Sequence, residues 1–253
     1  MPKETYQYLN YRVSGTGHPV VFLHGFLESM TMWDFLDFSD DFSQIRVDLP
    51  SHGHSLNDEE GCASMKEMAE HVKRTLRNLN ISQYDIVGHS MGGYVALELM
   101  KIDENCQKLV LMNSNFWSDD QKKQRDRKRV AEIVVRNKTL FLYEAIPNLF
   151  LDPQKNTEAV QGLIKEAEEM KAQSIADISI AISKRNDLSE LVIENNDRIL
   201  VIQGVEDSIV PVERMRTAQV EANFAYKELS DCGHMAHVEQ PNEVVSTILK
   251  FLS

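Results

Sequence analysis

The segment Gly88-His89-Ser90-Met91-Gly92, a G-x-S-x-G pentapeptide, offers the clearest potential for chemistry. A strand-like apolar run (YDIV) precedes it and a helix-like run (YVALELMK) follows it. A serine in such a tight strand-to-helix turn adopts a strained backbone conformation, and small neighbours let the chains approach closely. The start of the helix also directs free N–H groups towards the serine. The pattern predicts that Ser90 is a nucleophile; the alternative is an ordinary glycine-rich turn.

A second candidate segment is His24-Gly25-Phe26, at the end of the apolar run VVFL. A serine that transfers acyl groups requires two N–H donors aimed at the oxyanion that develops on the substrate. The backbone N–H of Met91 would supply one donor and that of Phe26 the other, while the Phe26 side chain would form a wall of the pocket. Alternatively, the segment is a simple turn that ends a strand, with His24 as a hydrogen-bonded structural residue.

An acid and a histidine that could serve the serine follow later in the chain. Asp207 comes after the run ILVIQ, and His234 comes after the run FAYKEL. The histidine would take the serine proton, and the carboxylate would fix the imidazole tautomer and stabilise the imidazolium. We prefer Asp207 to Glu206, although an aspartate in such a turn can simply form the turn. We prefer His234 to His237, which we expect to be a partly buried structural histidine.

These residues would be positioned by a mainly parallel sheet flanked by helices, because short apolar runs alternate with amphipathic stretches. An apolar stripe between Met65 and Leu79 predicts one helix, begun by a capping box of Ser64 and Glu67. The carboxyl ends of parallel strands meet at one edge of such a sheet, so the candidate residues should lie together there. Strands are expected at 6–13, 20–24, 45–48, 84–88, 109–113, 199–203 and 225–229.

The stretch 117–186 breaks this alternation, because it contains several helical segments and no convincing strand. We therefore expect a core domain formed by 1–116 and 187–253, and a helical cap, or lid, formed by 117–186.

Composition limits the partners. The net charge of −12 disfavours nucleic acid and anionic membranes as partners. The first residues lack the apolar stretch of a secretory signal, and no apolar run reaches membrane-spanning length. The three cysteines, Cys62, Cys106 and Cys232, are far apart and show no metal-ligand spacing, which favours reduced thiols in a cytoplasmic protein. The sequence gives no indication of the oligomeric state.

With these residues in place, the chain resembles the α/β-hydrolase superfamily over nearly its whole length, and its small, capped, esterase-like members most. The resemblance rests on HGF at 24–26, DLPSHGHS at 48–55, GHSMGG at 88–93, VEDSIVP at 205–211 and GHMAHVEQP at 233–241. One departure is Ser51, where the family usually has glycine; it concerns the packing of a loop.

The resemblance implies a triad of Ser90, Asp207 and His234, with Phe26 and Met91 as oxyanion donors. The expected activity is hydrolysis of a small-molecule carboxylic ester, or a thioester, through an acyl-enzyme. Such a triad needs no metal or organic cofactor, and we expect none.

Two alternatives stay open. One is a C–C bond lyase or hydrolase similar to the synthases of menaquinone precursors, although these place an arginine after the GG pair, where this chain has Tyr94. The other is a small-molecule receptor that retains the triad.

The substrate pocket is less well defined by the sequence. The side chains that we expect as candidates to line it are Phe26, Phe116, Trp117, Tyr143 and Phe150. Six of the eight residues at 122–129 are basic. We expect a solvated helix face there; a docking site for an acidic acyl carrier or a negatively charged substrate is the alternative.

Overall fold

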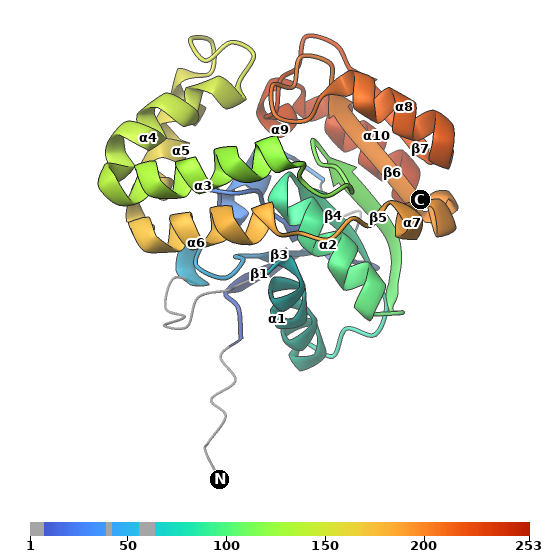
Figure 1. The fold of residues 1–253 in the computed structure, drawn as a ribbon. Helices are drawn as coiled ribbons and strands as arrows, with labels where there is room; N and C mark the ends of the chain where they lie inside the picture. Colours follow the sequence, from blue (N-terminus) through green and yellow to red (C-terminus); the bar gives the residue numbers. More distant parts are fainter. Residues whose placement is uncertain (1–7, 39–41, 56–63) are drawn as a thin grey trace.

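The computed structural model describes residues 8–38, 42–55 and 64–253. Within them lies a seven-stranded sheet of order β1-β3-β2-β4-β5-β6-β7 (Figure 1). β1 is antiparallel to β3, and the remaining neighbours are parallel. This confirms the predicted mainly parallel sheet. The strands are β1 (Tyr11–Ser14), β2 (Pro19–Leu23), β3 (Ser43–Val47), β4 (Tyr84–His89), β5 (Cys106–Met112), β6 (Ile199–Gly204) and β7 (Ala225–Leu229).

The central strands are apolar because helices cover both faces of the sheet. Val21 of β2 packs in a core cluster with α1 (Met65–Asn78) and α2 (Met91–Ile102), whereas its neighbour Phe22 packs in a second cluster with α10 (Pro241–Leu252). Successive side chains of a strand point to opposite faces, so each strand serves both clusters. All six residues of β4 are buried.

The remaining helices of the core come before β6, between β6 and β7, and after β7. They are α7 (Ser189–Glu194), α8 (Val212–Ala222) and α9 (Ala236–Glu239). Short 3₁₀ helices are η1 (Met30–Phe35), η2 (Gly53–Ser55) and η4 (Asn196–Arg198).

Sequence and structure differ mainly at the ends of elements. The expected strand at 6–13 is β1, which runs from Tyr11 to Ser14; positions 6 and 7 lie outside the described residues. β5 begins at Cys106, three positions before the expected start, where that residue pairs with Tyr84. The predicted cap of α1 is present, since Ser64 Oγ accepts a hydrogen bond from the N–H of Glu67 at 3.2 Å.

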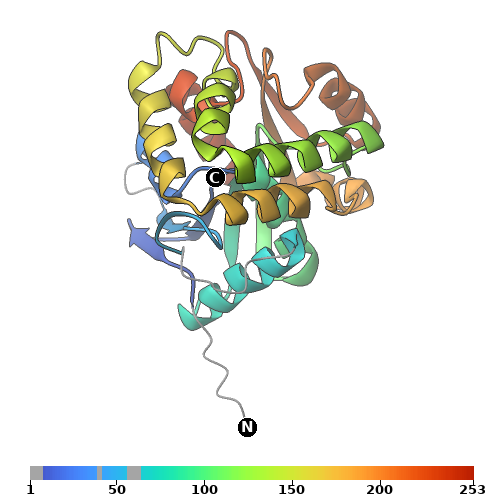
Figure 2. The same cartoon turned by 60° about the vertical axis from the view of Figure 1, so that its left-hand side comes forward.

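The segment 117–186 contains only helices and loops. The helices are α3 (Gln121–Arg136), α4 (Lys138–Ala145), η3 (Pro147–Leu149), α5 (Thr157–Glu169) and α6 (Ala172–Ser183). α3 and α6 lie side by side (Figures 1 and 2) and are joined by a hydrogen bond from Ser179 Oγ to the carbonyl of Arg127 at 3.1 Å. In the described part of the chain, no helix combines the length and apolar character needed to cross a membrane.

Candidate active site

Ser90 occupies the turn between β4 and α2, with φ of 50° and ψ of −115°. A positive φ is rare for a residue with a side chain and stores strain. The glycines on both sides are required by close backbone contacts: a Cβ at Gly88 would lie 2.6 Å from the carbonyl oxygen of Gly92, and one at Gly92 would lie 2.3 Å from that of Leu23. The Ser90 N–H donates to the Met112 carbonyl at 3.0 Å, which fixes the turn against β5.

The structure brings the predicted serine, histidine and aspartate together. His234 Nε2 lies 2.9 Å from Ser90 Oγ, and His234 Nδ1 lies 3.0 and 2.9 Å from the two carboxylate oxygens of Asp207. Nδ1–H therefore donates to the carboxylate and leaves Nε2 free to accept the serine proton. The His234 N–H donates to the Leu149 carbonyl at 2.9 Å, so η3 helps to hold this loop.

The Asp207 carboxylate is held by more groups than the sequence indicated. Its Oδ1 accepts from the N–H groups of Ile209 and Val210, and its Oδ2 accepts from Asn113 Nδ2 and Gln203 Nε2. Burial raises the pKa of this carboxyl, but the charge and hydrogen bond of His234 and these further donors outweigh burial and lower the pKa to about 2. Asp207 is therefore ionised and fixed in one orientation.

The two expected N–H donors line the same cavity as Ser90 and His234. Met91 is the first residue of α2, so its N–H has no acceptor within the helix. Phe26 follows β2, in a turn where Leu27 has a φ of 69°. His24 has a structural place: its Nε2 accepts from the N–H of Leu49 at 2.9 Å, and its Nδ1 lies 2.8 Å from the carbonyl of Gly25.

Sequence reasoning missed a buried ion pair next to these residues. His89 Nδ1 lies 2.8 Å from Glu28 Oε2, and His89 Nε2 lies 3.0 Å from the carbonyl oxygen of His234. Because both ring nitrogens face acceptors, both must donate, and the ring is an imidazolium. Burial lowers the pKa of His89, but the Glu28 carboxylate outweighs it and the net pKa is raised. Burial raises the pKa of Glu28, but His89 outweighs it and lowers the pKa to about 2.

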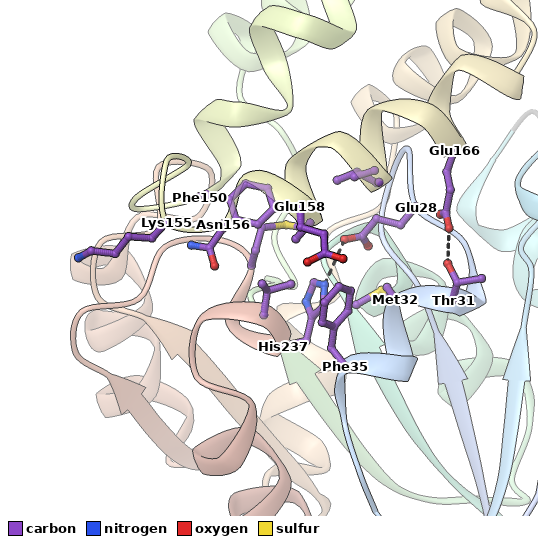
Figure 3. Close-up of a pocket in the computed structure, with 15 residues that line it drawn as sticks. Glu28, Thr31, Met32, Phe35, Phe150, Lys155, Asn156, Glu158, Glu166 and His237 are labelled. Carbon is purple, nitrogen blue, oxygen red and sulfur yellow. Dashed lines mark hydrogen bonds and ion pairs between the residues drawn. The ribbon is translucent and has the colours of Figure 1, made fainter.

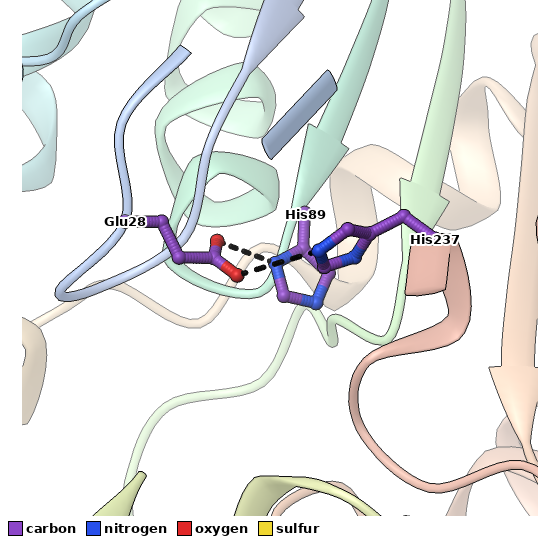
Figure 4. A group of neighbouring side chains, drawn as sticks. All are labelled: Glu28, His89 and His237. Carbon is purple, nitrogen blue, oxygen red and sulfur yellow. Dashed lines mark hydrogen bonds and ion pairs between the residues drawn. The ribbon is translucent and has the colours of Figure 1, made fainter. Parts of the chain in front are cut away.

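Figure 4 shows His237 beside this pair, and the three side chains could in principle bind a metal ion. Their ligand atoms lie within 4.8 Å of one another, and carboxylate and imidazole are common zinc ligands. However, a metal ion would have to displace the proton shared by Glu28 and His89. His237 is buried, with Nε2 4.0 Å from Glu28 Oε1, and burial lowers its pKa to about 3. His237 is more deeply buried than expected, and in the described part of the chain it forms no hydrogen bond or ion pair with Ser90.

The cavity that contains Ser90 has a volume of about 320 Å³ and a mainly apolar lining. Of the expected pocket residues, Phe26 lines it. The other candidates do not: Tyr143 projects outward and is 49% exposed, whereas Phe116 and Trp117 are buried. Phe116 packs against the rings of Trp117 and Phe224, and the guanidinium of Arg214 covers the Trp117 ring at 4.2 Å. The choice of these three as pocket residues requires correction, because core packing or solvent accounts for each.

Phe150 lines a second, larger cavity of about 530 Å³ (Figure 3). Ser90 is not among the residues that line this second cavity. This cavity shares Glu28 and Met235 with the first. Glu158 and Glu166 lie on its α5 side, and with Glu28 they give it three carboxylates against one lysine, Lys155. We assign the chemistry to the smaller cavity because it contains the nucleophile candidate.

Most of the basic cluster at 122–129 faces solvent, as expected for a solvated helix face. Arg127 is the exception, because it lines the cavity of Ser90. Its Nε donates to Asp119 Oδ2 at 2.5 Å.

Comparisons with known proteins agree with this fold. Residues 20–247 match the model of the alpha/beta hydrolase family. A thermophilic esterase from Thermogutta terrifontis, solved with malate bound, has a TM-score of 0.88 and 28% identity, covering 96% of this chain and 92% of the esterase. A pyrrolizixenacetamide deacetylase from Xenorhabdus hominickii is 24% identical over 258 residues, which are 96% of this chain and 94% of the deacetylase.

The dihydrolipoyllysine-residue acetyltransferase component of an acetoin cleaving system from Cupriavidus necator is 26% identical over 263 residues, which cover 95% of this chain. The chain spans only 65% of the length of that relative. With a family model matched over most of its length, the chain belongs to the alpha/beta hydrolase family, and it resembles the esterases of that family.

Proposed function

We propose that the protein is a serine hydrolase that cleaves a small-molecule carboxylic ester through an acyl-enzyme on Ser90. The observation that carries this proposal is the chain of contacts from Ser90 Oγ to His234 Nε2 at 2.9 Å, and from His234 Nδ1 to Asp207 at 2.9 Å. The strained turn at Ser90 supports it, because such strain presents a side chain at the top of a sheet. The similarity to an esterase at 28% identity points in the same direction.

In the proposed reaction, His234 Nε2 takes the proton of Ser90 as the serine oxygen attacks the ester carbonyl. The N–H groups of Phe26 and Met91 stabilise the oxyanion of the tetrahedral intermediate. The intermediate collapses, the acyl group stays on Ser90, and His234 returns the proton to the leaving alcohol. His234 then removes a proton from water as the water attacks the acyl-enzyme. When this second intermediate collapses and releases the acid, His234 returns the proton to Ser90 Oγ. Asp207, ionised throughout, stabilises the imidazolium.

The helices of segment 117–186 have a place in this proposal as a cap. Val130 of α3, Phe141 and Ala145 of α4 and Ile182 of α6 line the cavity of Ser90. They would shield the reaction from water and receive the apolar part of the substrate. A thioester fits the same mechanism, because its carbonyl would be attacked in the same way. The buried free thiols of Cys106 and Cys232 are compatible with a cytoplasmic location, and Cys62 lies outside the described residues.

The test is turnover of p-nitrophenyl esters from acetate to decanoate by the purified protein. We expect hydrolysis with an optimum at a short to medium acyl length, because the cavity of about 320 Å³ is small. Oxygen and sulfur esters of the same acyl group then separate esters from thioesters. Failure to hydrolyse any of them would instead favour the C–C bond reaction or a receptor function.

A further inference from the structure

Arg127 brings a guanidinium group to the cap side of the substrate cavity. Among the described residues that line this cavity, it is the only arginine or lysine. It projects from α3, whose other basic residues at 122–129 are not among the lining residues. Its side chain is 21% exposed, so it is accessible to a ligand. The rest of the cavity is mainly apolar, so an arginine in it requires an explanation.

The partner of Arg127 does not neutralise the site. Asp119 accepts from Arg127 Nε at 2.5 Å and forms an ion pair with Arg185 Nη1 at 2.6 Å. One carboxylate therefore faces two guanidinium groups, and the trio carries a net positive charge. Asp119 and Arg185 side chains are each 4% exposed, so they form a rigid support.

The two arginines are engaged differently. Arg185 is fixed on several sides: it contacts the Asn115 side chain and the Ile182 carbonyl, and its guanidinium lies 4.3 Å from the centre of the Tyr94 ring. For Arg127, the hydrogen bonds and ion pairs found in the described chain involve only Nε. Its two terminal nitrogens are thus available for a planar anion such as a carboxylate, which an arginine can bind through two parallel hydrogen bonds.

The position of Arg127 is held by the cap itself. The carbonyl of Arg127 accepts from Ser179 Oγ on α6 at 3.1 Å, and Asp119 orients the side chain from the loop before α3. Both contacts fix where the guanidinium lies relative to the cavity wall, as a binding group requires.

From these observations, and resting on the proposed ester hydrolysis, we infer that Arg127 binds a carboxylate carried by the substrate. The preferred substrates are then monoesters of dicarboxylic acids, or esters of hydroxy acids, rather than esters with two neutral ends. Such an anion also explains why a mainly apolar cavity has an arginine on its cap side.

The experiment compares ester pairs of equal carbon number in which a terminal carboxylate replaces a terminal methyl group. Monoethyl succinate, glutarate and adipate are matched with ethyl butanoate, pentanoate and hexanoate. For a carboxylate in the alcohol part, 4-acetoxybutanoate is matched with butyl acetate.

The wild type should show a higher kcat/KM for the anionic member of at least one pair. Arg127→Met should lower this anionic-to-neutral ratio about 10- to 100-fold, the range for a hydrogen-bonded charge pair. Arg129→Met, an exposed arginine on the same helix, should leave the ratio unchanged.

Three results are distinguished. Hydrolysis of neutral esters without preference for any anionic member, or a ratio that Arg127→Met leaves unchanged, overturns the inference and leaves the proposed function standing. If no ester is hydrolysed, the proposed function fails, and binding of monoethyl adipate and of 4-acetoxybutanoate to Ser90→Ala is measured by calorimetry. Binding that is lost in Ser90→Ala/Arg127→Met and kept in Ser90→Ala/Arg129→Met supports the carboxylate site. Absence of binding, or binding that is independent of Arg127, overturns it.

Discussion

His89, the residue before Ser90, forms a buried ion pair with Glu28: Nδ1 lies 2.8 Å from Glu28 Oε2. The pair joins three segments that must keep their relative positions. Glu28 Oε2 also accepts from the N–H of Gly25 at 2.5 Å, in the turn that carries Phe26. His89 Nε2 donates to the carbonyl of His234 at 3.0 Å. The turn after β2, the end of β4 and the histidine loop are therefore connected behind the reacting atoms.

We predict that Glu28→Gln lowers both stability and kcat. It leaves the His89 imidazolium without its counter-charge, and loss of one partner of a buried pair costs about 3 kcal/mol or more. Small displacements of His234 and the Phe26 turn should reduce kcat about 10- to 100-fold. Denaturant unfolding and p-nitrophenyl ester kinetics measure the two effects. Glu158→Gln, an exposed glutamate of the second cavity, is the control and should change neither.

The stability lost in Glu28→Gln should depend on pH. The pKa of Glu28 is lowered from 4.5 to about 2, so its contribution is complete above pH 4.5 and is lost as pH falls towards 2. The pKa of His89 is raised from 6.5, so its contribution is complete below pH 6.5 and is lost as pH rises through the raised pKa. The difference in unfolding free energy from wild type should therefore be greatest between pH 4.5 and 6.5. A difference that does not vary with pH would argue against the ion pair.

Asp207→Asn should lower kcat about 10⁴-fold while the protein remains folded, because the amide no longer selects the required His234 tautomer. Since the pKa of Asp207 is about 2, this carboxyl should cause no inflection in the pH–rate profile of the wild type above pH 4. Steady-state kinetics between pH 4 and 8, with circular dichroism of the variant, test both statements. A loss of less than tenfold would assign the orienting role to another residue.

The two neighbouring histidines should respond very differently to substitution. His234→Ala should lower kcat by at least 10³-fold, because it removes the base that contacts Ser90. His237→Gln should retain activity within about tenfold, because His237 lies beside Glu28 and not at the serine. Ester kinetics on both variants decide this. Comparable losses in the two would mean that His237 takes part in the reaction.

Two glycine substitutions provide a matched test of backbone crowding. A Cβ at Gly92 would meet backbone atoms of Leu23 and His24 at 2.3 to 2.7 Å, so Gly92→Ala should destabilise the protein and disrupt the serine turn. At Gly162, within α5, a Cβ would meet no atom within 4 Å. Gly162→Ala should therefore stabilise the protein by about 0.5–1 kcal/mol through helix propensity. Thermal unfolding of both variants should show shifts of opposite sign.

Much of the fold and the arrangement of Ser90, Asp207 and His234 could be predicted, because short stretches of the sequence indicate both the strands and the turns that follow them. Buried parallel strands leave apolar runs in the sequence, and the strained turn demands glycines at Gly88 and Gly92. Ser51 shows the limit of such reasoning: it adopts a φ of 64°, a backbone conformation that favours glycine, and glycine is the residue that the resemblance led us to expect there.

The contacts that escaped prediction depend on tertiary structure. Glu28 and His89 are 61 positions apart and have no common motif, and only the packing of the β2 turn against β4 unites them. Likewise, six basic residues in one helix are equivalent by composition, but the helical period directs only Arg127 into the cavity. Tyr143 was expected to line the pocket from its type alone, but the orientation of α4 exposes it.

The most direct test of the central claim is turnover of p-nitrophenyl butyrate by wild type and Ser90→Ala, with the mass of the intact protein measured during turnover. We predict that Ser90→Ala loses several orders of magnitude in kcat, and that wild type, but not the variant, gains the mass of one butyryl group. Ester turnover that survives in Ser90→Ala would contradict the account.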